Sequence, residues 1–410
     1  MQIFGTHDDA TRAQLAQVAE HARRVALMAD GHVGYVMPIG GVAAYADAVS
    51  VVGVGVDIAC GNAAIRTDAT LADLGAKPGR AQQQLERLAD RIAATVSFGV
   101  GRKNQADDAP TDDPLFDDPA WDAVPAAHRH SLRTKARQQL GTVGSGNHYV
   151  DVLADETGAL WVGVHFGSRG FGHTVASSFL ALGQGRAWGE RVPEREVLLD
   201  LHDPVGDAYW HLMNLAGRYA YAGREWVARK VVALLGAREL ELVHNHHNFA
   251  WRETHEVDGR TEEVIVVRKG ATPAFPGQTG FIGGSMGDDA VIVQGAAPAE
   301  PATAELQRAA LFSTVHGAGR VMSRTQAAGK RNRRTGKVLS PGRVTPAMMR
   351  EWVTRKGVVL RGGGLDESPH VYRRLPAVLA AQGGTIEVLH TLRPLVVVMA
   401  GADEFDPYKD

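Results

Sequence analysis

Hydrophobic residues recur at helical spacing in two parts of the chain. Leu15, Val18, Ala22 and Val25 lie three or four positions apart, and they follow Asp8, whose carboxylate can cap the start of a helix. The same spacing between residues 207 and 235 predicts a second, longer helix. Its expected buried positions are Leu212, Leu215, Tyr219, Trp226 and Val231.

Other segments have the composition of strands. Residues 35–55 are rich in valine, glycine and alanine, which predicts short strands joined by glycine turns, the last of them ending just before Asp57. The apolar runs 161–164 and 264–267 predict two further buried strands, and the first of these ends at His165. Strands mixed with helices, without an internal repeat, predict an α+β fold.

Residues 104–124 interrupt this pattern. The segment is rich in aspartate and proline. We expect it to be too polar and too broken to bury apolar surface, and therefore to form an exposed insertion or lid.

The composition, with 44% hydrophobic and 22% charged residues, is that of a globular chain long enough to bury a large core. The net charge of −2 excludes a global basic field that would attract nucleic acids. A local basic run can still bind a polyanion, or it can be a solvated loop. It comprises Arg320, Arg324, Lys330, Arg331, Arg333, Arg334 and Lys337.

No apolar run approaches the roughly 20 residues of a membrane-spanning helix, and the first ten residues lack the apolar centre of a signal peptide. The single cysteine suits a reducing compartment. These features predict a cytoplasmic protein without membrane contact.

Cys60 is the only cysteine, and it lies three positions after Asp57 in a glycine-bounded turn. A carboxylate and a thiolate on one turn can converge on a metal ion. His148, His165 and His247, in polar or glycine-rich surroundings, can complete one site or a pair of sites, although each alone is more often an ordinary core residue. Cysteine with histidine favours zinc or another late transition metal, so the donor set does not identify the metal.

His316 precedes Gly317 and Gly319, which should leave its imidazole accessible, and Arg320 follows at a position suited to phosphate. A neutral imidazole can act as a nucleophile, a base or a metal ligand, and all three roles remain open. The glycine-rich segment 283–287 offers backbone N–H groups that can bind phosphate. Together these features predict a metalloenzyme that acts on phosphates.

Taken in series, the motifs resemble the RtcB family of RNA-splicing ligases. The resemblance runs in one order over nearly the whole chain and implies a single large domain over residues 1–410, with a layered β core and surrounding helices. It includes DIACG at 57–61, GSGNH at 144–148 and HGAGR at 316–320. The other matching segments are 30–34, 37–43, 165–170, 247–248, 268–277 and 284–287.

The resemblance implies a GTP- and manganese-dependent ligase that joins an RNA 3′-phosphate or 2′,3′-cyclic phosphate to a 5′-hydroxyl. It implies that His316 accepts GMP covalently. Two manganese ions would be bound by Asp57, Cys60, His148, His165 and His247, with the thiolate shared between them. The implied nucleotide contacts are Asp30, Asn147, Asp151, Asn248, Gly284, Ser285, Met286, Gly317, Ala318, Gly319 and Tyr372. Arg169, Lys269, Arg320 and Arg324 are candidates for RNA phosphate contacts.

Three positions depart from the family pattern. The family usually ends close to a lysine-glycine pair whose lysine contacts guanine, but residues 398–401 read VMAG here and are followed by a short extension at 402–410. Asp151 stands where a glutamate is common, and Ala290 where a serine is frequent. A divergent paralogue that uses another nucleotide is therefore a competing hypothesis.

Two hypotheses from different functional classes also fit the residues. A metal-dependent phosphatase or nuclease would use the same ions without attaching a nucleotide to His316, and an RNA-binding protein could have lost turnover. An archease-like activator is a possible partner by the same resemblance, and we expect the chain to be a monomer.

Overall fold

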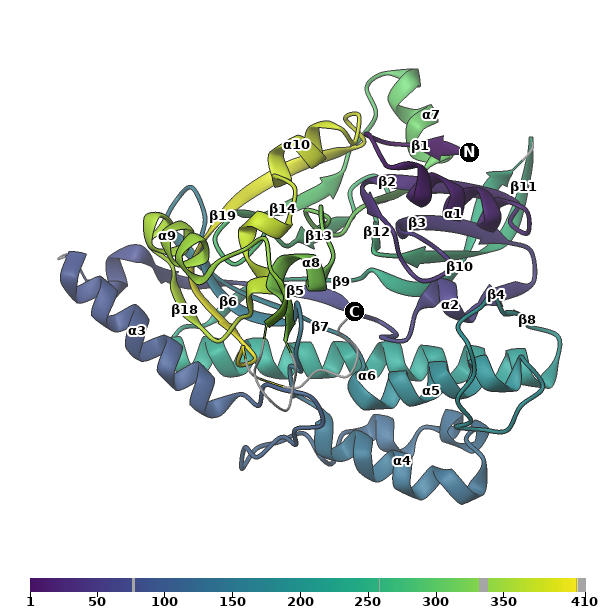
Figure 1. The fold of residues 1–410 in the computed structure, drawn as a ribbon, viewed down its shortest axis with the longest axis horizontal. Helices are drawn as coiled ribbons and strands as arrows, with labels where there is room; N and C mark the ends of the chain where they lie inside the picture. The colour runs from purple at the N-terminus through teal and green to yellow at the C-terminus, as the bar shows by residue number, and fades with distance from the viewer. Residues whose placement is uncertain (76–77, 258, 332–337, 403, 405–410) are drawn as a thin grey trace.

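The computed structural model describes residues 1–75, 78–257, 259–331, 338–402 and 404. Most of the expected C-terminal extension, and residues 332–337 of the basic run, lie outside the described residues. Within them the fold is α+β, as predicted, with two large sheets and helices packed around them (Figure 1). No described helix combines the length and the apolar character needed to cross a membrane.

The larger sheet has eight strands and curves strongly. Its order is β13-β14-β19-β6-β7-β5-β9, and β18 pairs with β19 in parallel. The strands are β5 (Gly61–Thr70), β6 (Tyr149–Ala154), β7 (Ala159–Phe166), β9 (Glu239–His246), β13 (Thr279–Ile282), β14 (Ala290–Gly295), β18 (Val359–Arg361) and β19 (Ile386–Met399).

The two ends of this sheet meet without main-chain pairing among the described residues. β13 packs against β9, and two asparagine side chains bridge the gap. The amide of Asn62 donates to the carbonyl of Phe281 at 2.9 Å, and the N–H of Phe281 donates to the side-chain oxygen of Asn245 at 3.0 Å. The sheet is therefore nearly closed into a barrel.

The second sheet has the order β1-β2-β3-β11-β10. Three smaller pairs join β12 to β15, β16 to β17, and β4 to β8. The bounds are β1 (Gln2–Ile3), β2 (Arg24–His32), β3 (Ile39–Tyr45), β4 (Ala48–Ser50), β8 (Leu198–Asp200), β10 (Asn248–Val257), β11 (Arg260–Lys269), β12 (Ala271–Pro273), β15 (Ser313–Val315), β16 (Gly329–Arg331) and β17 (Val338–Pro341).

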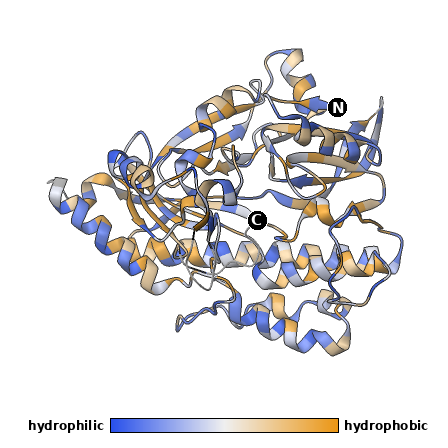
Figure 2. Cartoon of the chain, viewed as in Figure 1, coloured by the Kyte–Doolittle hydropathy of each residue, from blue (hydrophilic) through white to orange (hydrophobic). Residues whose placement is uncertain are grey.

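Helix α6 (Pro204–Leu235) packs against β5 and β7 of the larger sheet, with α5 beside it, and α3 packs on β18 and β19. Hydrophobic residues concentrate in the central strands, whereas the outlying helix α4 is largely hydrophilic (Figure 2). The remaining helices lie around the sheets (Figure 1). Their bounds are α1 (Asp9–Ala19), α2 (Val51–Val54), α3 (Pro78–Thr95), α4 (Ala126–Gln139), α5 (Arg169–Leu182), α7 (Pro301–Ala309), α8 (Arg324–Ala328), α9 (Pro346–Lys356) and α10 (Leu375–Ala380).

The longer predicted elements are confirmed, and the shorter ones are partly wrong. Helix α6 and strands β7 and β11 cover the predicted segments. The N-terminal helix begins after Asp8, which accepts from the N–H of Thr11 at 2.7 Å, but it ends at Ala19, and Val25 belongs to β2. The last apolar run before Asp57 forms helix α2 rather than a strand, because Ser50 caps it through the N–H of Gly53.

The expectation that residues 104–124 bury no apolar surface is wrong. Phe116 and Trp121 are buried in the core that also contains α5 and α6, and the indole N–H of Trp121 donates to the carbonyl of Leu115 at 2.9 Å. Asp113 and Asp118 cap two short 3-10 turns, so these aspartates organise the segment. None of its residues lines the cavity described below.

A buried ion pair links the two strands of the hairpin β10–β11, and its arginine also reaches the neighbouring segment. The Arg268 guanidinium is fully buried and donates to both carboxylate oxygens of Glu253, at 2.7 and 3.0 Å. It also donates to the hydroxyl of Ser313 and the carbonyl of Leu311. This residue therefore couples β11 to the segment that leads to β15.

We expect Arg268→Met to lower the free energy of unfolding by about 3–5 kcal/mol, because the substitution removes the guanidinium that pairs with both carboxylate oxygens of the buried Glu253. Arg252→Met is the matched control on the same hairpin, since Arg252 pairs with Glu263 at an exposed position. Its removal should change the same quantity by at most about 1 kcal/mol. Urea denaturation followed by circular dichroism measures both, and equal effects would contradict the prediction.

Candidate active site

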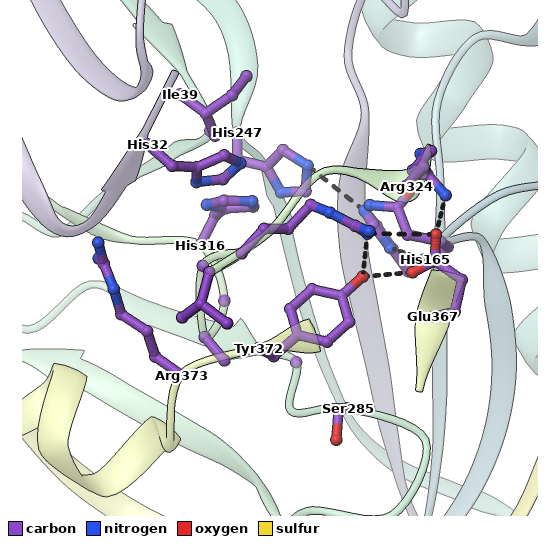
Figure 3. Close-up of a pocket in the computed structure, with 18 of the residues that line it drawn as sticks. His32, Ile39, His165, His247, Ser285, His316, Arg324, Glu367, Tyr372 and Arg373 are labelled. Atoms are coloured by element: carbon purple, nitrogen blue, oxygen red, sulfur yellow. Dashed lines mark hydrogen bonds and ion pairs between the residues drawn. The ribbon is translucent and has the colours of Figure 1, made fainter. Parts of the chain in front are cut away.

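A cavity of about 1040 Å³ is lined by residues of both large sheets and of the loops between them. It gathers most of the site residues expected from the sequence. Figure 3 shows the rings of His32, His247 and His316 grouped together near Tyr372. The expected residues that line the cavity are Asp57, Cys60, Asn147, His148, Asp151, His165, His247, Asn248, Gly284, Ser285, Met286, His316, Gly317, Ala318, Gly319, Arg320, Arg324 and Tyr372.

A tight turn brings Asp57 and Cys60 into the cavity. Ala59 has a left-handed backbone with φ of 60°, which is strained for a residue with a side chain. Its N–H donates to the carbonyl of Asn248 at 2.7 Å, and the N–H of Cys60 donates to the carbonyl of Asp57 at 3.1 Å. These bonds hold the strained turn, and Cys60 then leads directly into β5.

The cysteine sulfur belongs to two groups of potential metal ligands. The first contains Cys60, His165 and His247, and the second contains Asp57, Cys60 and His148, each with donor atoms within 4.8 Å of one another. The Cys60 Sγ lies 3.3 Å from Nε2 of His165 and 3.6 Å from Nε2 of His148. This arrangement can hold two cations that share the sulfur.

Backbone carbonyls orient two of the histidines. Nδ1 of His148 lies 2.8 Å from the carbonyl of Val143, and Nδ1 of His165 lies 2.9 Å from the carbonyl of Asn147. A carbonyl only accepts, so each Nδ1 carries a proton, and each Nε2 faces the sulfur, where its lone pair can bind a cation. Nε2 of His247 lies 3.4 Å from Nε2 of His165, and it completes the first group.

The electrostatics of the cluster suit a divalent cation. Burial tends to raise the pKa of Asp57, but the hydrogen bond and charge of His148 outweigh this effect and lower it to about 2. Burial lowers the pKa of His165 to about 3, so its ring is neutral. Burial and the nearby Asp57 raise the pKa of the Cys60 thiol, and a bound metal would favour the thiolate instead. The donors therefore fit a metal centre.

The fixed orientation of His316 comes from Asp30, which is fully buried behind it. Oδ2 of Asp30 lies 2.6 Å from Nδ1 of the imidazole and accepts from the backbone N–H of His316 at 3.1 Å. A proton on Nδ1 would face this carboxylate and would leave a lone pair on Nε2. The ring of His247 lies against that of His316, with centroids 4.8 Å apart, so the imidazole and the metal ligands share one cavity.

Two arginines also line the cavity. Arg320 donates to the hydroxyl of Tyr372 at 3.1 Å and to the carbonyl of Asp366 at 2.7 Å. Arg324 pairs with Asp366 at 3.0 Å and with Glu367. These contacts orient both guanidinium groups at the cavity wall, where they can bind phosphate oxygens.

A third part of the wall combines polar and apolar groups. The hydroxyl of Ser285 donates to Asp288 at 2.8 Å, and Met286, Val397 and Met399 add apolar surface. The buried Oδ1 of Asp151 has no hydrogen-bond partner among the described residues, and burial raises the pKa of this carboxyl. A buried polar atom that faces a cavity without a partner is suited to contact a ligand.

Three expected site residues lie outside the cavity lining. Asp30 contacts His316 from behind, so its prediction as a direct nucleotide contact is not supported. The Lys269 ammonium is buried and donates to the carbonyls of Tyr35 and Val52, at 2.7 and 3.0 Å, which contradicts its prediction as an RNA phosphate contact. Nη1 of Arg169 lies 3.2 Å from Nδ1 of His148, behind the metal ligands.

The sequence analysis missed several residues of the cavity wall. His32, in the matching segment 30–34, lines the cavity, and that motif was a signal for it. Glu367 and Arg373 also line the cavity (Figure 3). Their sequence context contains no comparable signal, because both reach the site only through the tertiary fold.

The family model described as tRNA-splicing ligase RtcB matches residues 12–400. The chain belongs to the RtcB family. RNA-splicing ligase RtcB1 of Escherichia coli is 32% identical over 399 residues, covering 92% of this chain and 90% of that protein. The tRNA-splicing ligase RtcB of Thermococcus kodakarensis is 31% identical, covering 90% and 86%, and the Mycobacterium bovis RNA-splicing ligase RtcB is 30% identical, covering 90% and 95%. These matches confirm the resemblance drawn from the motifs.

We expect substitutions of the shared and unshared ligands to change metal stoichiometry differently. His247→Ala removes a donor from one group only, so it should lose one of two bound manganese ions. Cys60→Ala removes the sulfur from both groups and should weaken both ions. Equilibrium dialysis with manganese measures the bound equivalents, and full retention of both ions by Cys60→Ala would contradict a shared sulfur.

Proposed function

We propose that this chain is an RNA ligase that joins an RNA 3′-phosphate, or a 2′,3′-cyclic phosphate after hydrolysis, to a 5′-hydroxyl end with the use of GTP. The names of its relatives, as RNA- and tRNA-splicing ligases, support the activity. One structural observation carries the mechanism. The imidazole of His316 is oriented by Asp30 and lies beside the ligand His247, so a phosphate bound at the metal ligands would be within reach of Nε2.

The proposed reaction begins at His316. Its Nε2 attacks the α-phosphorus of GTP, an N–P bond forms, and the bond to the bridging oxygen breaks to release pyrophosphate. An oxygen of the RNA 3′-phosphate then attacks the same phosphorus, which breaks the N–P bond and transfers GMP to the RNA. Finally the 5′-hydroxyl loses its proton and attacks the 3′-phosphorus, GMP leaves, and a phosphodiester forms. Together these steps replace one difficult displacement at a phosphate monoester by several easier ones.

Asp57, Cys60, His148, His165 and His247 would hold two divalent ions, proposed to be manganese, which neutralise phosphate oxygens and activate a bound hydroxyl. Arg320 and Arg324 would bind phosphate oxygens of the nucleotide or the RNA. Asn147 and Asn248 line the cavity next to His148 and His247 in the chain and would orient the nucleotide. Arg169 lies behind His148 and outside the cavity lining, so it is not proposed as an RNA contact.

The nucleotide base would occupy the wall formed by Tyr372, Ser285, Met286 and Asp151. The unpartnered Oδ1 of Asp151 supports a hydrogen bond to the base there. Val397 and Met399 add apolar side chains to the same wall, near the segment where the family resemblance leads us to expect a lysine. GTP is the nucleotide proposed from the family resemblance, and a comparison with ATP tests this choice.

The central test is covalent labelling. We expect GTP radiolabelled at its α-phosphate to label the protein in the presence of manganese, with an acid-labile bond, and His316→Ala to abolish the label. Labelling that persists in His316→Ala would overturn the nucleophile assignment. Labelling by ATP but not GTP would keep the mechanism and change the nucleotide. Release of phosphate from RNA ends without any protein label would favour a metal-dependent phosphatase or nuclease.

A second prediction tests the role of the Asp30 carboxylate behind His316. We expect Asp30→Asn to slow self-nucleotidylation by about 10²-fold or more, because an amide can stabilise the wrong tautomer of His316. Manganese binding should be unchanged, since Asp30 belongs to neither ligand group. Rapid-quench labelling gives the rate, and a rate equal to that of the unsubstituted chain would contradict the role given to Asp30.

Three further expectations complete the proposal and rest on the family resemblance and the composition. An archease-like activator would assist turnover, the chain would act as a monomer, and it would work in the cytoplasm on RNA ends left by splicing or cleavage. Sedimentation and turnover assays with and without such an activator test the first two.

A further inference from the structure

Arg224 is a fully buried cation at the middle of α6 that takes no part in the proposed reaction. Its Nη1 donates to the carbonyls of Ala59 and Phe166, at 2.8 and 2.6 Å. Ala59 precedes Cys60, and Phe166 follows His165. One nitrogen therefore holds the backbone beside two metal-ligand candidates from different strands.

The other two guanidinium nitrogens of Arg224 contact β9, the strand that precedes His247. Its Nη2 donates to Nδ1 of His246, the residue before His247, at 2.8 Å, and its Nε donates to Nε2 of His244 at 2.8 Å. Both ring nitrogens accept from a cation, so both rings are neutral. Glu225 lies 3.5 Å from Nδ1 of His244 and favours that tautomer. All four hydrogen bonds thus go to uncharged acceptors.

The packing around Arg224 leaves space for its guanidinium and for no additional side chain at Gly61. A Cβ at Gly61 would lie 3.1 Å from Nη2 of Arg224 and 2.2 Å from the carbonyl oxygen of Asn245, so a side chain at this position would displace the guanidinium and β9. The ring of Tyr221 stacks on His246 with centroids 3.9 Å apart and keeps that acceptor in place. The site is therefore built around Arg224 from α6, β5 and β9.

We propose that Arg224 is a positioning residue that fixes the Cys60, His165 and His247 donors at ligand distance before a cation binds. The proposal rests on the metal centre of the proposed function. One rigid, planar group contacts the carbonyls beside Cys60 and His165 and the ring of His246 beside His247, so the donor separations of 3.3 and 3.4 Å are set by the protein. Preorganised donors spare a cation the ordering of three separate segments.

The second ligand group provides an internal comparison. Asp57, Cys60 and His148 share only Cys60 with the contacts of Arg224, because His148 is oriented by the carbonyl of Val143. Loss of the guanidinium should therefore weaken the ion bound by His165 and His247 much more than the ion bound by Asp57 and His148.

The positive charge of Arg224 and its positioning of the donors predict opposite changes in metal affinity when the residue is replaced. A buried positive charge near a cation site repels the cation, so its removal would tighten metal binding if charge dominated. If position dominates, its removal weakens binding, typically about 10- to 100-fold for groups that support metal ligands from behind. The direction of the change in affinity therefore distinguishes the two roles.

The experiment uses the full chain and cobalt, whose thiolate charge-transfer absorption reports binding at Cys60, with manganese calorimetry beside it. In a His148→Ala background, which isolates the Cys60, His165 and His247 group, we expect Arg224→Lys and Arg224→Met to weaken binding about 10- to 100-fold. In a His247→Ala background the same changes should have a far smaller effect. Arg268→Lys, at a buried guanidinium that does not line the cavity, is the control for general destabilisation.

Several outcomes would overturn the proposal. Arg224→Lys keeps the positive charge but removes the planar guanidinium. If this variant binds cobalt as tightly as the unsubstituted chain, or more tightly, the guanidinium has no positioning role. Equal losses in both backgrounds, or a chain that folds in neither Arg224 variant, would make Arg224 a residue of the fold alone. Absence of the charge-transfer band in the unsubstituted chain would instead reject the proposed metal centre, and that result is separate from any effect of Arg224.

Discussion

The register of three neighbouring strands is the constraint on which the site depends. Gly61 of β5 pairs with Phe166 of β7 on one side and with His246 of β9 on the other. Cys60, His165 and His247 each lie within one position of these partners, and the N–H of His247 donates to the carbonyl of Cys60 at 2.9 Å. A slip of one residue would turn His165 to the other face of the sheet. Strand pairing therefore determines the donor geometry.

The second sheet and the pair β12–β15 surround His316, the proposed nucleophile, rather than the candidate metal ligands. β2 carries Asp30 and His32, β10 begins at Asn248, and β15 ends just before His316. The cavity lies where these elements meet the strands beside Cys60, His165 and His247, so the candidate metal ligands and His316 come from different sheets. The close approach also requires Gly319, where a Cβ would lie 2.2 Å from the carbonyl oxygen of Asp30. The chemistry therefore depends on the packing of one sheet against the other.

The sequence could predict the chemical donors, because their types and motif contexts are local properties. It could also predict α6, β7 and β11, whose apolar patterns are long. It could not predict that Lys269 donates to the carbonyls of Tyr35 and Val52, since a lysine in a motif gives no sign of which carbonyls will surround it. Similarly, the aspartates of residues 104–124 suggested an exposed segment, but Phe116 and Trp121 alone supply enough apolar surface to anchor it.

The junction between the two ends of the curved sheet has a mechanical consequence. The other neighbouring strands of this sheet, in its described part, are joined by ladders of main-chain bonds, whereas here the backbone of Phe281 is held by the amides of Asn62 and Asn245. We expect local opening of this seam, which is held by two side-chain hydrogen bonds, to require less free energy than opening of a ladder of main-chain hydrogen bonds. Because Asn245 of β9 lies two residues before His247, opening of this seam would act directly on the segment that carries a candidate metal ligand.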